Sequence, residues 1–266
     1  MKMEQNDLNR AASYLCRRTD NFLWETYKAS RCVGEPCSMR LRFPRPFSKQ
    51  FGEQEVQLSE QEARTLFCYA IETTKKGDFS YLYSVEVPTA FAFGKEKQKR
   101  KISGRSDVTL YEQAHPRLPV LNVEFKCGGI MANNKQLDEI VTKDMKKLLG
   151  EEASGLWFHV VKKQELVAIT KQLEAWQTSV KRVVDEFGKY LVPKQLIFHL
   201  CCLEGAFSLT KTLDFTGTAP YFSEDFFLLQ AAGGRAVTKK HFSEASQLNK
   251  WETWRNKPGT EVSSGA

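Results

Sequence analysis

The sequence predicts an α/β protein in which a mixed β-sheet is covered by helices on both faces. A segment with apolar residues at helical spacing begins near Ser59, and three strand-like segments follow it without an intervening helix. Beyond them, helical and strand-like segments alternate as far as Leu203. Consecutive strands favour antiparallel pairing and strands separated by helices favour parallel pairing, so the two patterns in one chain indicate a mixed sheet.

The helix that begins at Ser59 is predicted from its cap and its apolar stripe. Ser59 and Glu62 have the spacing of a capping box. Five apolar residues recur on one face at helical period: Ala63, Leu66, Phe67, Ala70 and Ile71. We expect this helix to end at Gly77, because glycine commonly terminates helices.

The remaining elements follow from the same kind of pattern. Strands are expected at 81–93, with an interruption near Pro88, and at 106–111, 120–126, 156–161 and 195–203. Helices are expected at about 164–190 and at 134–149, where one face carries Leu137, Val141, Met145 and Leu148. Within the apolar strands, His159 and His199 are interpreted as core histidines.

The chain divides into three parts. Residues 1–57 are expected to be an irregular N-terminal extension, in which the prolines of 40–47 indicate extended structure or a loop. Residues 58–205 form the predicted core. Residues 206–266 are expected to be an accessory segment that packs on the core and contains an aromatic cluster. The cluster comprises Tyr221, Phe222, Phe226 and Phe227. Trp251 and Trp254 lie three residues apart on an expected helix and are interpreted as packing residues, with stacking on single strands as the alternative.

Composition favours a cytoplasmic protein that does not insert in membranes. Hydrophobic residues make up 41% of the chain, yet no apolar run approaches the roughly 18–20 residues that span a bilayer. The N-terminus lacks the apolar stretch of a secretory signal, so the seven cysteines are expected to be reduced. Cys32 and Cys37 have the spacing of half a zinc site, but no second pair follows them.

Positive charge suggests an anionic partner. The net charge is +7, and the segment 95–105 holds six basic residues against one acidic residue. This segment is either a solvated hairpin tip or a loop that grips backbone phosphates directly before Asp107. The residues that would contact phosphate are Lys97, Lys99, Arg100, Lys101 and Arg105.

Alternation along two strands brings three charged residues together. Leu121, Val123 and Phe125 share one face of their strand, so Glu124 and Lys126 share the other. In the preceding strand Asp107 lies on the face opposite Val108 and Leu110. If the two strands pair, the carboxylates of Asp107 and Glu124 lie close to Lys126.

Two adjacent carboxylates repel unless a cation lies between them, and Mg²⁺ suits carboxylate ligands with waters and a substrate phosphate. We expect Asp107 and Glu124 to bind Mg²⁺, with Mn²⁺ able to substitute. Lys126 would orient the attacking water or stabilise charge on the phosphate. The alternative is an ordinary surface ion pair between Glu124 and Lys126, worth at most about 1 kcal/mol.

The segments GRSDVTLYE and VLNVEFKCGG, followed by the helix NNKQLDEIVTKDMKKLL, resemble the PD-(D/E)xK nuclease superfamily. The resemblance spans about 59–203 and implies a restriction-endonuclease-like fold. It implies catalytic and metal-binding roles for Asp107 on the second core strand, and for Glu124 and Lys126 on the third.

A further acidic residue from the first helix or strand often joins such a site. Glu62 and Glu86 are the favoured candidates, and Glu72 is a rival. On the helix that follows, Lys143 and Lys147 either contact phosphate or lie on a solvated face.

The leading hypothesis is a magnesium-dependent endonuclease, with DNA favoured over RNA by the resemblance. Cutting both strands would suit a homodimer. The alternatives are a non-catalytic nucleic-acid-binding protein on the same fold and a protein-interaction module with an incidental basic surface.

Overall fold

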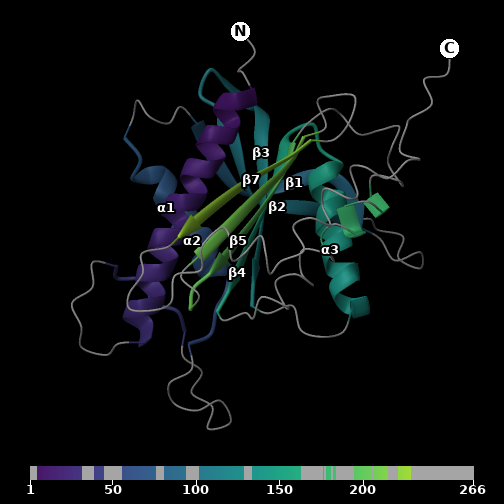
Figure 1. Cartoon of the computed structure of the whole chain (residues 1–266). Coiled ribbons are helices and arrows are strands. Elements are labelled where there is room, and N and C mark those ends of the chain that lie inside the picture. Colours follow the sequence, from purple (N-terminus) through teal and green to yellow (C-terminus); the bar gives the residue numbers. More distant parts are fainter. Residues whose placement is uncertain are drawn as a thin grey trace, which may run out of the picture.

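The computed structural model describes residues 5–31, 39–44, 56–75, 81–93, 102–128, 134–162, 176, 178–180, 182–183, 195–204, 207–214 and 221–228 of the 266-residue chain. The helices are α1 (Gln5–Arg31), α2 (Glu60–Glu72) and α3 (Asn134–Leu149). The strands are β1 (Tyr81–Phe93), β2 (Ile102–Glu112), β3 (His115–Cys127), β4 (Ser154–Val161), β5 (Gln195–Cys202), β6 (Phe207–Asp214) and β7 (Tyr221–Leu228). Figure 1 shows these elements, with α1 and α2 on one side of the sheet and α3 on the other.

The sheet is mixed, as the strand pattern predicts. Its strands follow the order β1 to β7, each beside its neighbour in sequence. The pairs β3–β4 and β4–β5 are parallel, and the other four pairs are antiparallel. The α/β class and the helices on both faces are therefore confirmed. None of the described helices is both long and apolar enough to cross a membrane.

Helix α2 begins and packs as predicted. The Ser59 hydroxyl accepts a hydrogen bond from the Gln61 N–H at 3.2 Å, and all five residues of the predicted stripe are buried. The helix ends at Glu72, so the expectation that it continues to Gly77 is wrong; Gly77 itself lies outside the described residues. The Thr73 N–H and hydroxyl both bond to the Tyr69 carbonyl, which satisfies the last turn without a glycine.

The expectation that the first 57 residues are irregular is wrong, because α1 is a helix of 27 residues. Its inner face buries Leu8, Ala12, Leu15 and Leu23 in the same apolar core as α2 and the sheet. Buried polar residues, among them Asp20, interrupt this stripe and conceal it in the sequence. The Asp20 carboxylate is bound by the His199 ring of β5 at 2.8 Å.

The expectation of an accessory layer at the C-terminus is also wrong for the part that is described. Strands β6 and β7 continue the sheet beyond β5 instead of packing on it. In β6, Phe207, Leu209 and Leu213 are buried and follow a period of two, which is the signal of a strand. The predicted aromatic cluster lies in β7, and Trp251 and Trp254 lie outside the described residues.

The other predicted elements occur with small changes in length. Strand β1 and helix α3 have the predicted bounds, and the β1–β2 register shifts between Pro88 and Ala92, as the proline indicates. Strands β2 and β3 are longer than predicted and form a hairpin. Strands β4 and β5 are buried along their whole length, which accounts for their unbroken apolar pattern. Of the helix predicted at about 164–190, residues 176, 178–180 and 182–183 are described and helical.

Candidate active site

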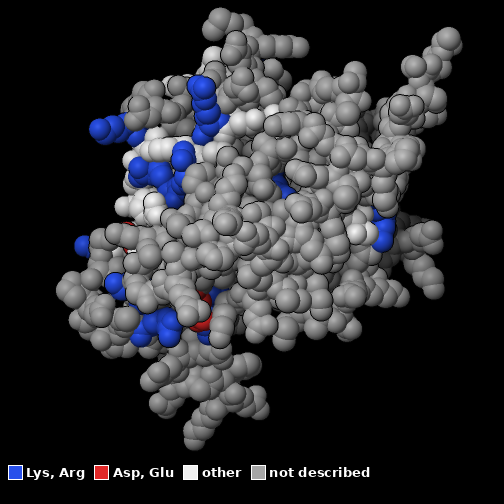
Figure 2. All heavy atoms as spheres, in the orientation of Figure 1, with Lys and Arg blue, Asp and Glu red and all other residues white. Residues whose placement is uncertain are grey.

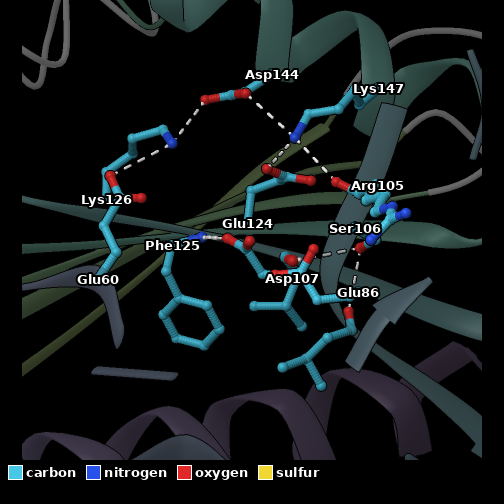
Figure 3. Close-up of polar contacts among 12 residues, drawn as sticks. Glu60, Glu86, Arg105, Ser106, Asp107, Glu124, Phe125, Lys126, Asp144 and Lys147 are labelled. Carbon is cyan, nitrogen blue, oxygen red and sulfur yellow. Dashed lines mark hydrogen bonds and ion pairs between the residues drawn. The ribbon is translucent and has the colours of Figure 1, made fainter. Parts of the chain in front are cut away.

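The two faces of β3 separate core from site, as alternation predicts. Val123 and Phe125 are fully buried, and the Phe125 ring packs against Phe67 of α2 with ring centroids 5.4 Å apart. Glu124 and Lys126 point the other way and meet side chains from α3 (Figure 3). Burial of the apolar face of β3 in the core therefore places Glu124 and Lys126 on the opposite face.

Asp107 lies where β2 and β3 stop pairing. The last register pair toward this end is Val108 with Val123, so the backbone ladder does not reach residue 107. The Asp107 carboxylate instead accepts a hydrogen bond from the Phe125 N–H at 2.8 Å. This bond orients Asp107 beside Glu124. The negative charge of Asp107 helps to raise the pKa of Glu124.

Glu124 is the most buried acid of the site, with 2% of its side chain exposed. Its Oε2 contacts the Lys147 ammonium, while its Oε1 is buried and has no hydrogen-bond partner among the described residues. Burial raises the pKa of Glu124 to about 8. The negative charges of Asp144 and Asp107 also raise this pKa, whereas the positive charge of Lys147 lowers it. A buried carboxyl group with a raised pKa and one unpaired oxygen is a candidate functional group.

Lys126 is held as a cation. Its ammonium lies 3.2 Å from Asp144 Oδ2 and 3.5 Å from Glu60 Oε1. Burial alone would lower the pKa of Lys126, but the charges of Asp144, Glu60 and Glu124 outweigh it and raise that pKa above its usual value. Lys126 is therefore suited to stabilising negative charge and not to removing a proton.

Two members of the site come from α3 (Figure 3). Lys147 lies 3.3 Å from Asp144 Oδ1 and 3.2 Å from the Arg105 carbonyl oxygen, in addition to its contact with Glu124. Asp144 is 6% exposed and is shared by Lys126 and Lys147. Sequence reasoning overlooked Asp144 and weighed Lys147 only as a phosphate contact or a surface residue.

A signal for Asp144 was present in the sequence. It lies three residues after Val141 and four before Leu148, both of which are buried. A charged residue with this spacing lies on the inner face of the helix. Such a residue needs a partner inside the protein, and here the partners are two lysines.

The three residues predicted as a further acid of the site, Glu62, Glu72 and Glu86, have different surroundings. Glu62 is partly buried, and its Oε2 has no hydrogen-bond partner among the described residues. Glu86 is exposed and forms an ion pair with Arg64, and Glu72 accepts a hydrogen bond from the Tyr83 hydroxyl at 3.0 Å. The acid from α2 that reaches Lys126 is Glu60.

The predicted phosphate-binding residues are only partly described. The side chains of Arg105 and Lys143 are exposed. The other members of that prediction lie outside the described residues: Lys97, Lys99, Arg100 and Lys101.

Neither a protein-family model nor a curated protein matches this chain. Among solved structures, the central domain of yeast acetyl-CoA carboxylase is similar with a TM-score of 0.31 and 11% sequence identity. The match covers 77% of this chain and 34% of that chain, so this chain spans about a third of that structure. A similarity at this level assigns neither fold nor function.

The donors of the site suit a hard divalent cation only in part. Asp107 and Glu124 supply the carboxylate oxygens that Mg²⁺ prefers, and the buried Glu124 Oε1 is unpaired. Within the described part of the chain, however, no group of three or more His, Cys, Asp or Glu residues is arranged to hold a metal ion. The Lys147 ammonium lies between Glu124 and Asp144, and it therefore keeps Asp144 from acting as a third carboxylate ligand.

Both core histidines behave as predicted. His159 Nε2 lies 2.9 Å from the Gly128 carbonyl oxygen, and burial lowers the pKa of His159 to about 4, so the neutral ring donates that hydrogen bond. His199 is bonded to Asp20 and, at 2.7 Å, to the Thr210 hydroxyl. These contacts give each ring a structural role.

Proposed function

We propose that this protein is a divalent-metal-dependent nuclease that hydrolyses phosphodiester bonds, with DNA favoured over RNA. The observation that supports it most is the buried Glu124 carboxylate, which has one unpaired oxygen and lies beside Asp107. Lys126 projects from the same face of β3 as a cation. Two carboxylates with an adjacent lysine are the groups that metal-assisted phosphodiester hydrolysis needs.

The order of elements supports the finer proposal of a restriction-endonuclease-like core. Helix α2 is followed by three antiparallel strands, then by α3 and by β4 parallel to β3. Asp107 lies on the second of these strands, and Glu124 and Lys126 lie on the third. These are the positions that the resemblance to PD-(D/E)xK nucleases implies.

The roles of the side chains follow from their contacts. Asp107 and Glu124 would hold Mg²⁺, which when bound supplies an activated water and neutralises phosphate charge. The Phe125 N–H fixes the orientation of Asp107, and Lys147 fixes that of Glu124. Lys126, held by Asp144 and Glu60, would stabilise negative charge on the phosphate in the transition state.

The proposal is tested by cleavage of labelled double-stranded DNA, single-stranded DNA and RNA with Mg²⁺ and then Mn²⁺. We expect cleavage by the wild type, its loss in chelator, and a decrease of at least about 100-fold in Asp107→Ala and Lys126→Ala. Glu152→Gln, on an exposed turn, is the control. Circular dichroism verifies that each variant is folded. Wild-type cleavage rates in Asp107→Ala would overturn the assignment.

One observation favours a second candidate, a nucleic-acid-binding protein without catalysis. Lys126 and Lys147 form ion pairs with Asp144, Glu124 and Glu60, so part of the negative charge of the site is offset by cations of the chain itself. A protein of this kind would retain nucleic acid in a salt-dependent manner, unaffected by chelator and without cleavage.

A further inference from the structure

The outer face of α1 carries cations and aromatic rings in a single line. Arg10, Arg17, Lys28 and Arg31 are exposed. Tyr14 and Trp24 are partly exposed and lie between them, so that successive members are three, four or seven residues apart. This spacing places them along one side of the helix. Figure 2 shows Lys and Arg side chains gathered on the side of the molecule where α1 lies.

The rings and cations of this face contact one another. The Lys28 ammonium lies 6.0 Å from the centre of the Trp24 ring, and the Arg18 guanidinium lies 5.7 Å from that of Tyr14. Arg18 also lies 5.5 Å from the Phe22 ring, and Phe22 packs at 5.0 Å against Tyr69 of α2, which is 45% exposed. Arg18 thus links the Tyr14 ring to Phe22 and, through Phe22, to Tyr69 of α2.

The positive charge of this face is opposed in part by acids, since Arg31 lies 3.7 Å from Glu204 Oε1. Among the side chains described from Leu8 to Arg31, Glu25 is the exposed acid, whereas Asp20 is buried against His199. The apolar residues that attach α1 to the core lie on its inner face. Phe22 and Trp24 also pack partly against this core, so the outer face presents its cations and the exposed parts of its rings to solvent.

We propose that the outer face of α1 binds single-stranded nucleic acid. Arg10, Arg17 and Lys28 would contact phosphates along the strand, and Trp24 and Tyr14 would stack on bases. Bases are available for such stacking in a single strand and not in a duplex. Among the side chains described from Leu8 to Arg31, this face has no large aliphatic one to insert in a lipid surface, so a polyanion with aromatic bases fits it better than a membrane does.

This surface is separate from the candidate active site. Glu124 and Lys126 face α3 on one side of the sheet, and α1 lies on the other side (Figure 1). The inference therefore goes beyond the proposed nuclease and does not depend on metal or on cleavage.

The test is fluorescence anisotropy of a labelled oligothymidine of about 20 nucleotides with the full chain in chelator. We expect Arg17→Glu and Lys28→Glu each to weaken binding several-fold and to reduce the slope of log affinity against log salt by about 0.7. Arg117→Glu, an exposed change of equal charge in the β2–β3 hairpin, is the matched control. Trp24→Ala should weaken single-strand binding at least about fivefold and leave a duplex of the same length unaffected.

Equal affinities for Arg17→Glu, Lys28→Glu and Arg117→Glu would overturn the proposal, and so would binding to anionic vesicles without binding to the oligonucleotide. The two exposed charge variants keep the test decisive if Trp24→Ala fails to fold. Because the chelator prevents cleavage, loss of oligonucleotide binding in the α1 variants supports this surface even if no nuclease activity is found. Conversely, metal-dependent cleavage with unaltered oligonucleotide binding in those variants would reject this surface alone.

Discussion

Glu124→Gln should make the protein more stable at alkaline pH, although it removes a charged member of the candidate site. The native pKa of Glu124 is about 8, against 4.5 for an ordinary glutamate. Between these values the native state holds a proton that the unfolded chain has released, so the free energy of unfolding falls as pH rises through this window. Glutamine cannot ionise, so the free energy of unfolding of the variant does not fall in this way.

The size of the effect follows from the difference in pKa. One pKa unit corresponds to about 1.4 kcal/mol, so the loss above pH 8 approaches about 5 kcal/mol. In the variant the amide oxygen can still accept a hydrogen bond from Lys147. Lys147 also keeps Asp144 and the Arg105 carbonyl as partners, so the substitution leaves no cation unpaired.

Urea unfolding followed by tryptophan fluorescence, in chelator at about pH 5 and pH 9, measures this difference. We expect nearly equal stability at pH 5 and a variant that is more stable by several kcal/mol at pH 9. The exposed substitution Glu152→Gln is the control. A Glu124→Gln variant that is no more stable than wild type at pH 9 would refute the reasoning.

The same urea-unfolding assay, repeated with Mg²⁺, tests whether Glu124 binds a metal ion. If Glu124 binds Mg²⁺, the ion must displace its proton, so excess Mg²⁺ should stabilise the wild type and do so more strongly at pH 9 than at pH 5. Glu124→Gln should gain much less from Mg²⁺. Equal stabilisation of both proteins would argue against Glu124 as a ligand.

Two further predictions concern the fold. A Cβ at Gly155 would lie 2.9 Å from Leu196 Cδ1 and 3.0 Å from Leu148 Cβ, so Gly155→Ala should lower the free energy of urea unfolding by about 1–3 kcal/mol; an unchanged value would contradict this packing. Burial lowers the pKa of His199, but Asp20 outweighs it and raises that pKa to about 10. This pair therefore stabilises the fold fully below pH 6.5 and progressively less as pH rises toward 10. Asp20→Asn should cost about 3–5 kcal/mol at pH 6 and less near pH 10, whereas a constant cost across pH would exclude a charged His199.

Local patterns were enough to predict much of this protein. The stripe from Ala63 to Ile71 predicted α2, and alternation around Val123 predicted which side chains of β3 leave the core. These features depend on periodicity along a few residues, because one face of each element must be buried. The same periodicity placed Glu124 and Lys126 on one face before any strand pairing was known.

Only the tertiary structure decided which partners those residues have. Helix α1 was missed because its buried polar residues find partners such as His199, which lies 179 residues from Asp20 along the chain. Asp144 and Lys147 join the site because α3 crosses the sheet above β3, and Glu60 joins because α2 begins beside Lys126. A sequence pattern shows that a side chain faces inward, whereas the opposing charge that makes its burial tolerable comes from another element and is set by the packing of the whole chain.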